Sequence, residues 1–296
     1  MSDWRALRLA VTQTQVAAVE QVMEDNGALA VSITDAADNP LFEPPPGAAP
    51  LWPLCQVQAI FGQHEDDAII RAACQSALID ALGDNAPNIV ISDIEDQDWT
   101  RVWMDAFQPM RFGQRLWIVP SWHPCPEPQA VNLRLDPGLA FGTGTHPTTA
   151  LCLEYLDGVE HMPDRVLDFG CGSGVLALAA LMLGAQQADG TDIDPQALLA
   201  MQDNAQRNDL QSRIRTWLPE DFVPDQPYPM VLANILSGPL QQLAPQLSGY
   251  LAPGGTLVLS GLLTEQASDV MAAYPDIEFD PPASSGEWCR LSGRKR

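Results

Sequence analysis

The sequence predicts two domains, a small α+β domain followed by a larger α/β domain built on a doubly wound parallel sheet. The chain has 296 residues, about twice the length of an ordinary domain. Beyond residue 109, apolar strand-like runs alternate regularly with helical patterns, as in parallel sheets. Before residue 95 the strands and helices are mixed, as in a small α+β sandwich. We therefore expect domains at 1–95 and 109–296, joined by a helical linker at 96–108.

Sequence patterns place the elements of the first domain and the linker. Strand-like and helix-like runs alternate, and we expect strands at 4–12, 27–34 and 56–61 and helices at 14–26 and 65–82. In the linker, Trp99, Val102, Trp103 and Phe107 fall at helical spacing. We interpret these aromatic residues as one packed side of a helix rather than as a ligand platform.

The second domain shows a regular succession of elements. We expect strands at 165–169, 188–192, 229–233 and 256–260, and helices at 175–184, 195–208 and 239–251. Pro195 stands at the first turn of its predicted helix, where its missing N–H costs nothing. The turn Pro253-Gly254-Gly255 precedes the last of these strands.

Charge and composition exclude several classes of protein. Lys and Arg number 15 against 38 Asp and Glu, which gives a net charge of −23 and a pI near 4.2. Since phosphate neutralisation needs a basic face, we expect no direct nucleic-acid partner, whereas a basic protein would be attracted. The longest apolar run, 175–183, is far shorter than the roughly 20 residues of a membrane span. We expect a folded cytoplasmic protein without a membrane partner.

The cysteines indicate neither a metal site nor a disulfide framework. Six cysteines are scattered without any C-x-x-C pair, so we expect buried thiols and no metal.

A glycine-rich turn follows the predicted strand 165–169, in the string Asp168-Phe169-Gly170-Cys171-Gly172-Ser173-Gly174. Alternate glycines let the backbone approach a ligand closely at the carboxyl end of a strand, where α/β sheets bind ligands. A dinucleotide fingerprint would need glycine at position 175 or 177, which hold Val175 and Ala177. The pattern D-x-G-x-G-x-G instead resembles the loop of methyltransferases that use S-adenosylmethionine.

An acidic residue at the end of the next strand strengthens this interpretation. Asp192 lies 22 positions after Gly170, where its carboxylate can accept hydrogen bonds from both ribose hydroxyls of an adenosine. Asp194, before Pro195, is interpreted as a helix N-cap instead.

A third polar residue ends the strand predicted at 229–233. The amide of Asn234 can accept a hydrogen bond from an attacking amine, although Asn-Ile-Leu stands where many N-methyltransferases have Asn-Pro-Pro-aromatic. No general base is evident from the sequence. His146, the nearest candidate, begins a predicted helix and is interpreted as a cap or a cofactor contact.

The segment 135–149, LDPGLAFGTGTHPTT, is Gly-Thr-rich and ends in a proline-started helix, whose free N–H groups suit a carboxylate. With DFGCGSG, DIDP and ANIL after it, this segment closely resembles the bacterial ribosomal protein L11 methyltransferase family. The resemblance extends through most of the chain, including a Trp-Met-Asp-Ala-Phe connector and the end strand at Gly286-Glu287-Trp288. It implies a Rossmann-like methyltransferase sheet, with cofactor contacts at Thr149, Gly170, Asp192 and Asn234 and a pocket shaped by Phe141 and Gly172.

The same resemblance implies the reaction and the partner. Members of this family transfer methyl groups from S-adenosylmethionine to lysine side-chain amines and the N-terminal amine of the large-subunit ribosomal protein L11. Their small N-terminal domain binds that substrate. We expect Asn234 to position the amine, and we expect a monomer. A nicotinamide-dependent oxidoreductase and a non-catalytic binding protein on the same fold remain as alternatives.

Overall fold

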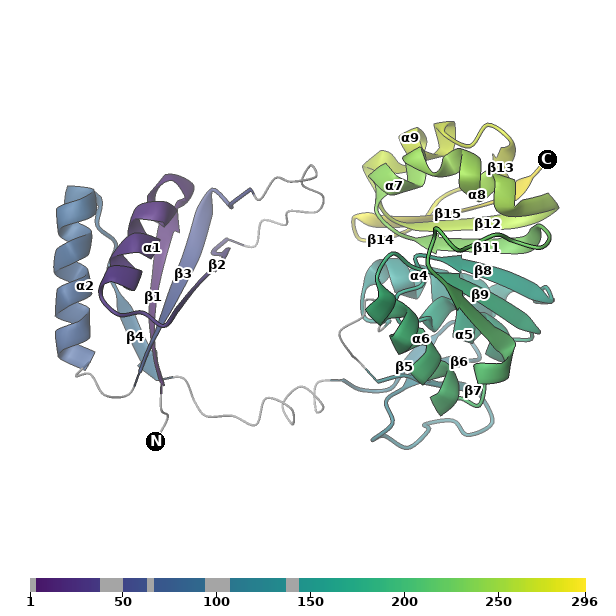
Figure 1. The fold of residues 1–296 in the computed structure, drawn as a ribbon, viewed down its shortest axis with the longest axis horizontal. Helices are drawn as coiled ribbons and strands as arrows, with labels where there is room; N and C mark the ends of the chain where they lie inside the picture. The colour runs from purple at the N-terminus through teal and green to yellow at the C-terminus, as the bar shows by residue number, and fades with distance from the viewer. Residues whose placement is uncertain (1–3, 38–49, 63–66, 94–106, 137–143) are drawn as a thin grey trace. The chain divides into compact units, whose positions relative to one another are not determined.

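The computed structural model describes residues 4–37, 50–62, 67–93, 107–136 and 144–296. The chain divides into two compact units, Met1–Val102 (unit 1) and Trp103–Arg296 (unit 2), shown in Figure 1. Most of the linker helix predicted at 96–108 lies outside the described residues. Phe107 and Gln108, which are described, are not helical.

Unit 1 is a four-stranded antiparallel sheet in the order β2-β3-β1-β4, with helices α1 and α2. Side chains of β1 and β3 alternate between the helix-covered core, which includes Leu7, Val57 and Phe61, and the opposite face. The elements are β1 Trp4–Thr12, η1 Gln13–Gln15, α1 Val16–Asp25, β2 Ala30–Asp35, β3 Leu54–Gly62, α2 Asp67–Leu82, η2 Gly83–Asn85 and β4 Val90–Asp93. The predicted strands and helices are therefore present, and the short β4 is an addition.

Unit 2 is built on an eight-stranded sheet whose main path runs β10-β9-β8-β11-β12-β15-β13, with β14 paired to β15. The pairs from β10 to β12 are parallel, and β13, β14 and β12 all pair antiparallel with β15. Its elements include α4 Pro147–Gly158, β8 Arg165–Phe169, α5 Val175–Met182, β9 Gln187–Thr191, α6 Pro195–Arg207, η3 Gln211–Arg213, β10 Ile214–Trp217, β11 Tyr228–Asn234, α7 Ser237–Gln242, α8 Ala244–Tyr250, β12 Leu251–Leu263, η4 Thr264–Gln266, α9 Ala267–Ala272, β13 Ile277–Phe279, β14 Ala283–Ser285 and β15 Trp288–Lys295.

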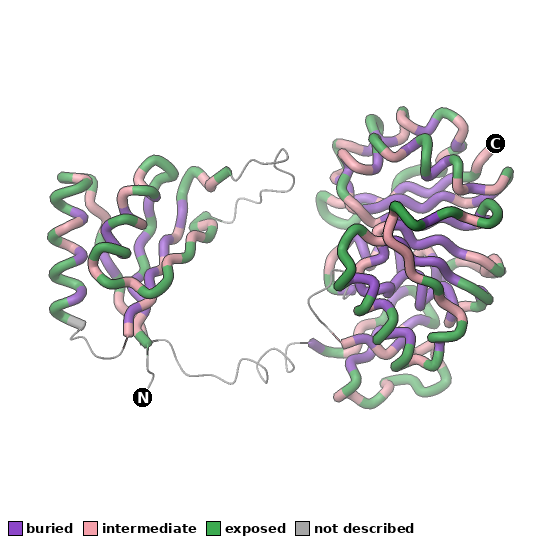
Figure 2. Tube along the Cα trace, viewed as in Figure 1, coloured by how far each residue is buried: buried purple, intermediate pink, exposed green. Residues whose placement is uncertain are grey.

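Helices cover both faces of this sheet. Helices α4, α5 and α6 lie on one side, and α7, α8 and α9 lie on the other (Figure 1). Successive residues of one strand enter opposite cores: Val166 packs into the first and Leu167 into the second. Figure 2 shows the central strands of unit 2 as its most continuously buried part. Burial on both faces explains the apolar runs at 166–167 in β8 and 230–233 in β11.

The strand order reverses beside β8. The chain proceeds from β8 outward to β9 and β10, then crosses to β11 and β12 on the other side of β8. In open α/β sheets, ligands bind outside the carboxyl ends of the strands at such a switch point. The residues that end β8 and β11 are therefore placed at the binding crevice by topology.

Several features of unit 2 differ from the prediction or add to it, and among the additions are the strand β10 and the helix α9. The predicted helix 239–251 is two helices, α7 and α8, because Pro245 in the first turn of α8 cannot donate a backbone hydrogen bond. The sheet carries antiparallel strands at one edge and is not wholly parallel. A separate three-stranded sheet, not predicted, consists of β5 Met110–Phe112, β6 Leu116–Val119 and β7 Val131–Arg134.

The cysteines carry free thiols, as expected. All six lie among the described residues; five are buried and Cys125 is partly exposed. Within the described ranges, no group of three or more His, Cys, Asp or Glu side chains could hold a metal ion. A search of the same ranges finds no helix long and apolar enough to cross a membrane.

Lys295, the single lysine of the chain, lies at the end of β15. Its Nζ donates hydrogen bonds to the carbonyl oxygens of Ser248 (2.6 Å) and Leu251 (3.2 Å), and it lies 3.9 Å from Oδ2 of Asp276. The ammonium group is thus held against the chain, and the side chain is only 22% exposed.

Candidate functional site

The glycine loop leaves β8 in a backbone conformation that requires glycine. Gly170 has φ of 72°, and a Cβ there would collide with Cγ2 of Ile235. The amides of Gly170 and Cys171 donate to the carbonyl oxygen of Thr191, at 2.8 and 3.0 Å. The loop is therefore fixed to the end of β9, and its backbone lines an open space beside the sheet.

Asp192 follows β9 and is oriented by the backbone on both sides. Its Oδ2 accepts from the amide of Gly172 at 2.9 Å, and its Oδ1 accepts from the amide of Asp194 at 3.0 Å. Each carboxylate oxygen keeps a further lone pair. The structure therefore leaves Asp192 able to accept two more hydrogen bonds, as a ribose diol requires. Asp194 caps α6 by accepting from the amide of Gln196, as predicted.

Asn234 ends β11 beside the first turn of α4. Its Nδ2 donates to Oγ1 of Thr149 at 3.1 Å, and Thr149 itself is fully buried. The Oδ1 of Asn234 is buried and has no hydrogen-bond partner within the described structure. Because a buried polar atom without a partner is costly, this oxygen is a vacant acceptor that a ligand N–H would satisfy.

His146 is an N-cap, as the sequence suggested. Its Nδ1 accepts from the amide of Thr148 at 3.3 Å and lies 2.7 Å from the hydroxyl of that residue. Burial lowers the pKa of His146, which favours the neutral ring. A neutral imidazole that accepts at Nδ1 carries its proton on Nε2, so this ring is poorly suited to remove a proton from an amine.

Asp168, at the end of β8, is a charged group that the sequence prediction did not assign to the site. The carboxyl group is buried, and its Oδ2 accepts from the amide of Ala177 at 3.0 Å. Burial raises the pKa of Asp168 to about 7. The motif D-x-G-x-G-x-G contained this signal, because Asp168 is its first residue.

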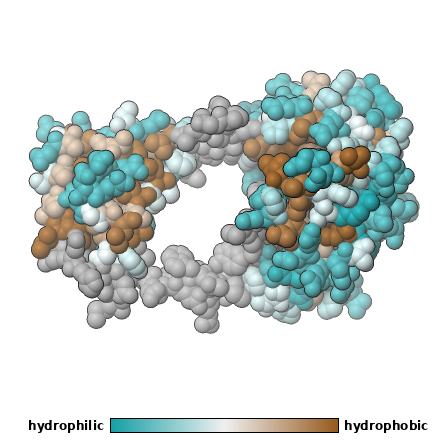
Figure 3. Space-filling view, viewed as in Figure 1, coloured by the Kyte–Doolittle hydropathy of each residue, from teal (hydrophilic) through white to brown (hydrophobic). Residues whose placement is uncertain are grey.

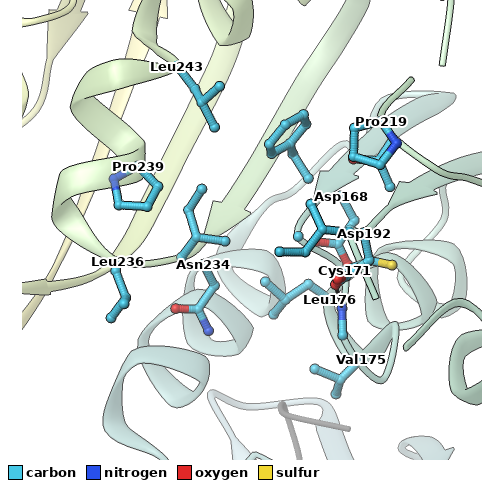
Figure 4. A pocket seen from close by; sticks show the side chains of 16 residues that line it. Asp168, Cys171, Val175, Leu176, Asp192, Pro219, Asn234, Leu236, Pro239 and Leu243 are labelled. Atoms are coloured by element: carbon cyan, nitrogen blue, oxygen red, sulfur yellow. Dashed lines mark hydrogen bonds between the residues drawn. The ribbon is translucent and has the colours of Figure 1, made fainter. Parts of the chain in front are cut away.

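Asp168, the glycine loop, Asp192 and Asn234 surround one cavity of about 380 Å³, which is the size of a small-molecule site (Figure 4). Its lining comes from β8, the glycine loop and the start of α5, from the end of β9, from the segment after β10, and from the end of β11 with α7. The lining residues are Asp168, Phe169, Gly170, Cys171, Gly172, Val175, Leu176, Thr191, Asp192, Ile193, Pro219, Asn234, Ile235, Leu236, Pro239 and Leu243. We call this the first cavity.

The structure brings together most of the predicted site residues. Gly170, Gly172, Asp192 and Asn234 line the first cavity, and Thr149 lies directly behind Asn234. Phe141 lies outside the described residues. Sequence reasoning missed the apolar lining from Pro219, Leu236, Pro239 and Leu243, because these residues reach the cavity only through the strand order.

Exposed apolar residues belong to the lining of the first cavity. Figure 3 shows hydrophobic residues gathered on the viewed face of unit 2, within a hydrophilic surround. Among the cavity residues, Ile193 is 85% exposed and Leu236 is 46% exposed. Apolar walls with a few fixed polar groups are typical of cofactor sites.

The residues present fit S-adenosylmethionine. Thr191 and Asn234 both line the first cavity. The buried hydroxyl of Thr191 and Oδ1 of Asn234 lack hydrogen-bond partners in the described structure, so a bound ligand could supply those partners. Asp192 offers acceptors for a ribose, and the apolar walls offer faces for an adenine. Asp168 and Asp192 also give the first cavity an acidic lining, which suits a cationic sulfonium.

Comparisons with known proteins agree with this fit. The profile of the ribosomal protein L11 methyltransferase family matches residues 3–296. Ribosomal protein L11 methyltransferases of Pseudomonas aeruginosa (strain LESB58) and Azotobacter vinelandii are each 54% identical over 295 residues, which cover 99% of both chains. A solved ribosomal protein L11 methylase from Lactobacillus delbrueckii subsp. bulgaricus is 32% identical, with a TM-score of 0.58, covering 64% of this chain and 100% of the other.

These matches identify the chain as a methyltransferase and reject the alternative of a nicotinamide-dependent oxidoreductase. Both the family profile and the relatives extend over nearly the whole chain, so the match is not confined to the glycine loop. The chain belongs to the ribosomal protein L11 methyltransferase family and is an enzyme that uses S-adenosylmethionine.

Proposed function

We propose that this enzyme methylates lysine side-chain amines and the N-terminal amine of ribosomal protein L11. The observation that carries this proposal is the orientation of Asn234 at the edge of the first cavity. Because Thr149 accepts from Nδ2, the amide presents its Oδ1 as an unused acceptor. An amine nitrogen that donates one N–H to this oxygen keeps its lone pair available for attack.

The cofactor supplies a methyl group on a sulfonium, whose neutral thioether leaves without needing an acid. The task left to the chain is to hold a neutral amine in line with that methyl group. Lysine has an ordinary pKa of about 10.4, and transfer into a site shielded from water lowers it. We propose that the amine loses its proton to water and that Asn234 then orients it, with His146 acting only as a cap.

Cofactor binding is proposed to rest on six residues of unit 2, which are Phe141, Thr149, Gly170, Gly172, Asp192 and Asn234. Asp192 would accept from the ribose hydroxyls, and the backbone at Gly170 and Gly172 would allow the ligand to approach closely. Thr149, at the N-terminal turn of α4, would act through Asn234 and the positive end of the helix. Phe141 is proposed to help shape the pocket on the strength of the family resemblance alone.

Unit 1 is proposed to recognise the protein substrate. The predicted boundaries, with 1–95 as the recognition domain, 96–108 as a linker and 109–296 as the methyltransferase domain, remain our proposal. The described residues that line the first cavity all belong to unit 2. Acidic residues outnumber basic ones in both units, and the net charge of −23 would attract a basic ribosomal protein. We place the reaction in the cytoplasm, where ribosomal proteins are made, and propose a monomer.

The test is methyl incorporation from labelled S-adenosylmethionine into purified ribosomal protein L11, with the modified amines located by mass spectrometry. We expect label on lysine side chains and on the N-terminal amine. The control substrate has its amines blocked by acetylation and should take up no label. Tight binding of S-adenosylmethionine together with no incorporation into L11 would reject the proposed substrate while leaving the cofactor assignment intact.

A further inference from the structure

A second cavity adjoins the first at the end of β11. Its volume is about 250 Å³, and it shares three lining residues with the first cavity. The lining residues are His146, Thr148, Asn234, Ile235, Leu236, Gly261 and Trp288. In Figure 4, Asn234 and Leu236 lie at one end of the first cavity, away from Asp168 and Asp192. The two cavities therefore meet at the residue proposed to orient the amine.

The second cavity differs from the first in its chemistry. No carboxylate or ammonium group belongs to its described lining, and burial lowers the pKa of His146 and favours its neutral form. The rings of His146 and Trp288 meet edge to face, with centroids 4.7 Å apart. A site without a carboxylate holds no ion-pair partner for an ammonium, and desolvation there lowers the pKa of an entering amine. The second cavity thus favours the form of the amine that can attack.

Its walls are fixed by a close backbone approach. Gly261 in β12 has φ of 90°, and a Cβ there would collide with the carbonyl oxygen of Ile235. The pairing of β12 with β15 shifts its register at this point, between Leu259 and Leu262. Gly261 lies within the shifted segment, Trp288 pairs with Leu263 just beyond it, and both residues line the second cavity.

We propose that the second cavity receives the acceptor amine with its alkyl stem, and that Trp288 is the side chain that binds this stem. The inference rests on the proposed function and adds the place where the acceptor enters. The volume is below the usual range for drug-sized ligands, so the cavity suits one extended side chain and not a folded element. The indole supplies apolar area for the methylene groups of the stem.

This placement separates the two substrates. Trp288 lines the second cavity and does not line the first, whereas Asp192 lines only the first. Loss of the indole should therefore weaken use of the acceptor while leaving S-adenosylmethionine bound. A role confined to stability of β15 would instead reduce both properties together.

The experiment uses the full chain with Trp288→Ala, Trp288→Phe and a control, Trp122→Ala, whose indole lines neither cavity. Cofactor affinity is measured by equilibrium titration. Initial rates of methyl incorporation into ribosomal protein L11 are measured over a range of L11 concentrations at saturating cofactor. We expect Trp288→Ala to lower kcat/KM for L11 by about tenfold, mainly through KM, and to keep the cofactor Kd within about twofold. Trp288→Phe should recover part of the loss, and Trp122→Ala should match the unchanged enzyme.

Two outcomes would overturn the inference. One is a kcat/KM for L11 within twofold of the unchanged enzyme in both Trp288 variants. The other is an equal loss of cofactor affinity and kcat/KM in Trp288→Phe, which would assign the indole to the fold or to the cofactor. Absence of incorporation by the unchanged enzyme would instead reject the proposed function, so the two failures are distinguishable.

Discussion

The amide of Asn234 donates to the hydroxyl of Thr149 at 3.1 Å, and this contact joins the end of β11 to the first turn of α4. The relationship holds the amide in one orientation, since its nitrogen is engaged while its oxygen has no partner in the described structure. The orientation of one side chain therefore depends on a second one 85 residues away in the sequence.

Replacement of either partner tests this orientation. Asn234→Ala should lower kcat by tenfold or more and change the Kd of S-adenosylmethionine less, because the amide is proposed to act on the amine. Thr149→Val, which keeps the shape and removes the acceptor, should give a smaller loss of kcat. Single-turnover rates and cofactor titrations measure the two effects. Unchanged turnover in a folded Asn234→Ala variant would remove this residue from the site.

Asp192 should contribute mainly to cofactor affinity. Asp192→Ala removes two acceptors proposed for the ribose, as well as those used by the amides of Gly172 and Asp194. Loss of charge-assisted hydrogen bonds of this kind costs about 1.5–3 kcal/mol each, so we expect at least a tenfold rise in the cofactor Kd. Asp194→Ala, which loses only a helix cap, is the matched control and should leave the Kd near its original value. Equal affinities in both variants would contradict the ribose assignment.

The glycine loop should tolerate no side chain at position 170. In Gly170→Ala the new Cβ meets Cγ2 of Ile235, and the backbone must keep a positive φ that costs alanine about 1–2 kcal/mol. We expect lower stability and much weaker cofactor binding. Adding Ile235→Ala should relieve the steric part and leave the backbone part. Thermal unfolding of the single and double variants measures this coupling, and strict additivity would show that the two side chains do not collide.

The pH dependence of stability should report the burial of Asp168. Burial raises its pKa from 3.8 to about 7, so between these values the folded state binds more protons than the unfolded state. The contribution of this group to the free energy of unfolding should therefore fall as the pH rises from about 4 to about 7 and then level off. Asp168→Asn should lack this fall and gain up to about 4 kcal/mol relative to the unchanged protein above pH 7. Denaturant titrations without cofactor, from pH 4 to 8, measure the free energy of unfolding of both proteins. If the two free energies change in parallel with pH, the raised pKa of Asp168 is refuted.

Removal of unit 1 should separate cofactor binding from substrate recognition. A chain that begins at Trp103 keeps every described residue of the first cavity, so it should fold and bind S-adenosylmethionine. It should lose methylation of intact ribosomal protein L11 at cofactor saturation. With the full chain, association with L11 should slow as salt rises, because screening weakens attraction between unlike charges. Equal methylation by the shortened chain would place recognition in unit 2.

The strands β8 and β11 could be predicted from the sequence because each holds an apolar run bounded by turn residues, as 165–169 is by Gly170. The site residues could be identified because Gly170, Asp192 and Asn234 each lie at the end of a predicted strand. The edge strands were harder to predict. The three-residue strand β13 owes its conformation to pairing with β15, a contact that no local pattern encodes.

The same limit explains what was missed in the site. Trp288 is 54 positions beyond Asn234, and only the strand order places both at one cavity. Asp168 was visible as the first residue of its motif, but its burial, and therefore its raised pKa, depends on helix α5 packing against β8. Sequence patterns indicate residues that end strands, whereas neighbours from other elements become evident only with the fold.

The arrangement of Lys295 has a consequence for an enzyme that acts on lysine. The chain carries 15 basic residues, and all but this one are arginines, whose guanidinium groups do not lose their proton at any ordinary pH. The remaining ε-amine, that of Lys295, donates hydrogen bonds to two backbone carbonyl oxygens. It cannot reach an active site unless these hydrogen bonds break. The protein therefore has almost no side-chain amine that it could methylate itself, and we expect self-methylation to consume little S-adenosylmethionine.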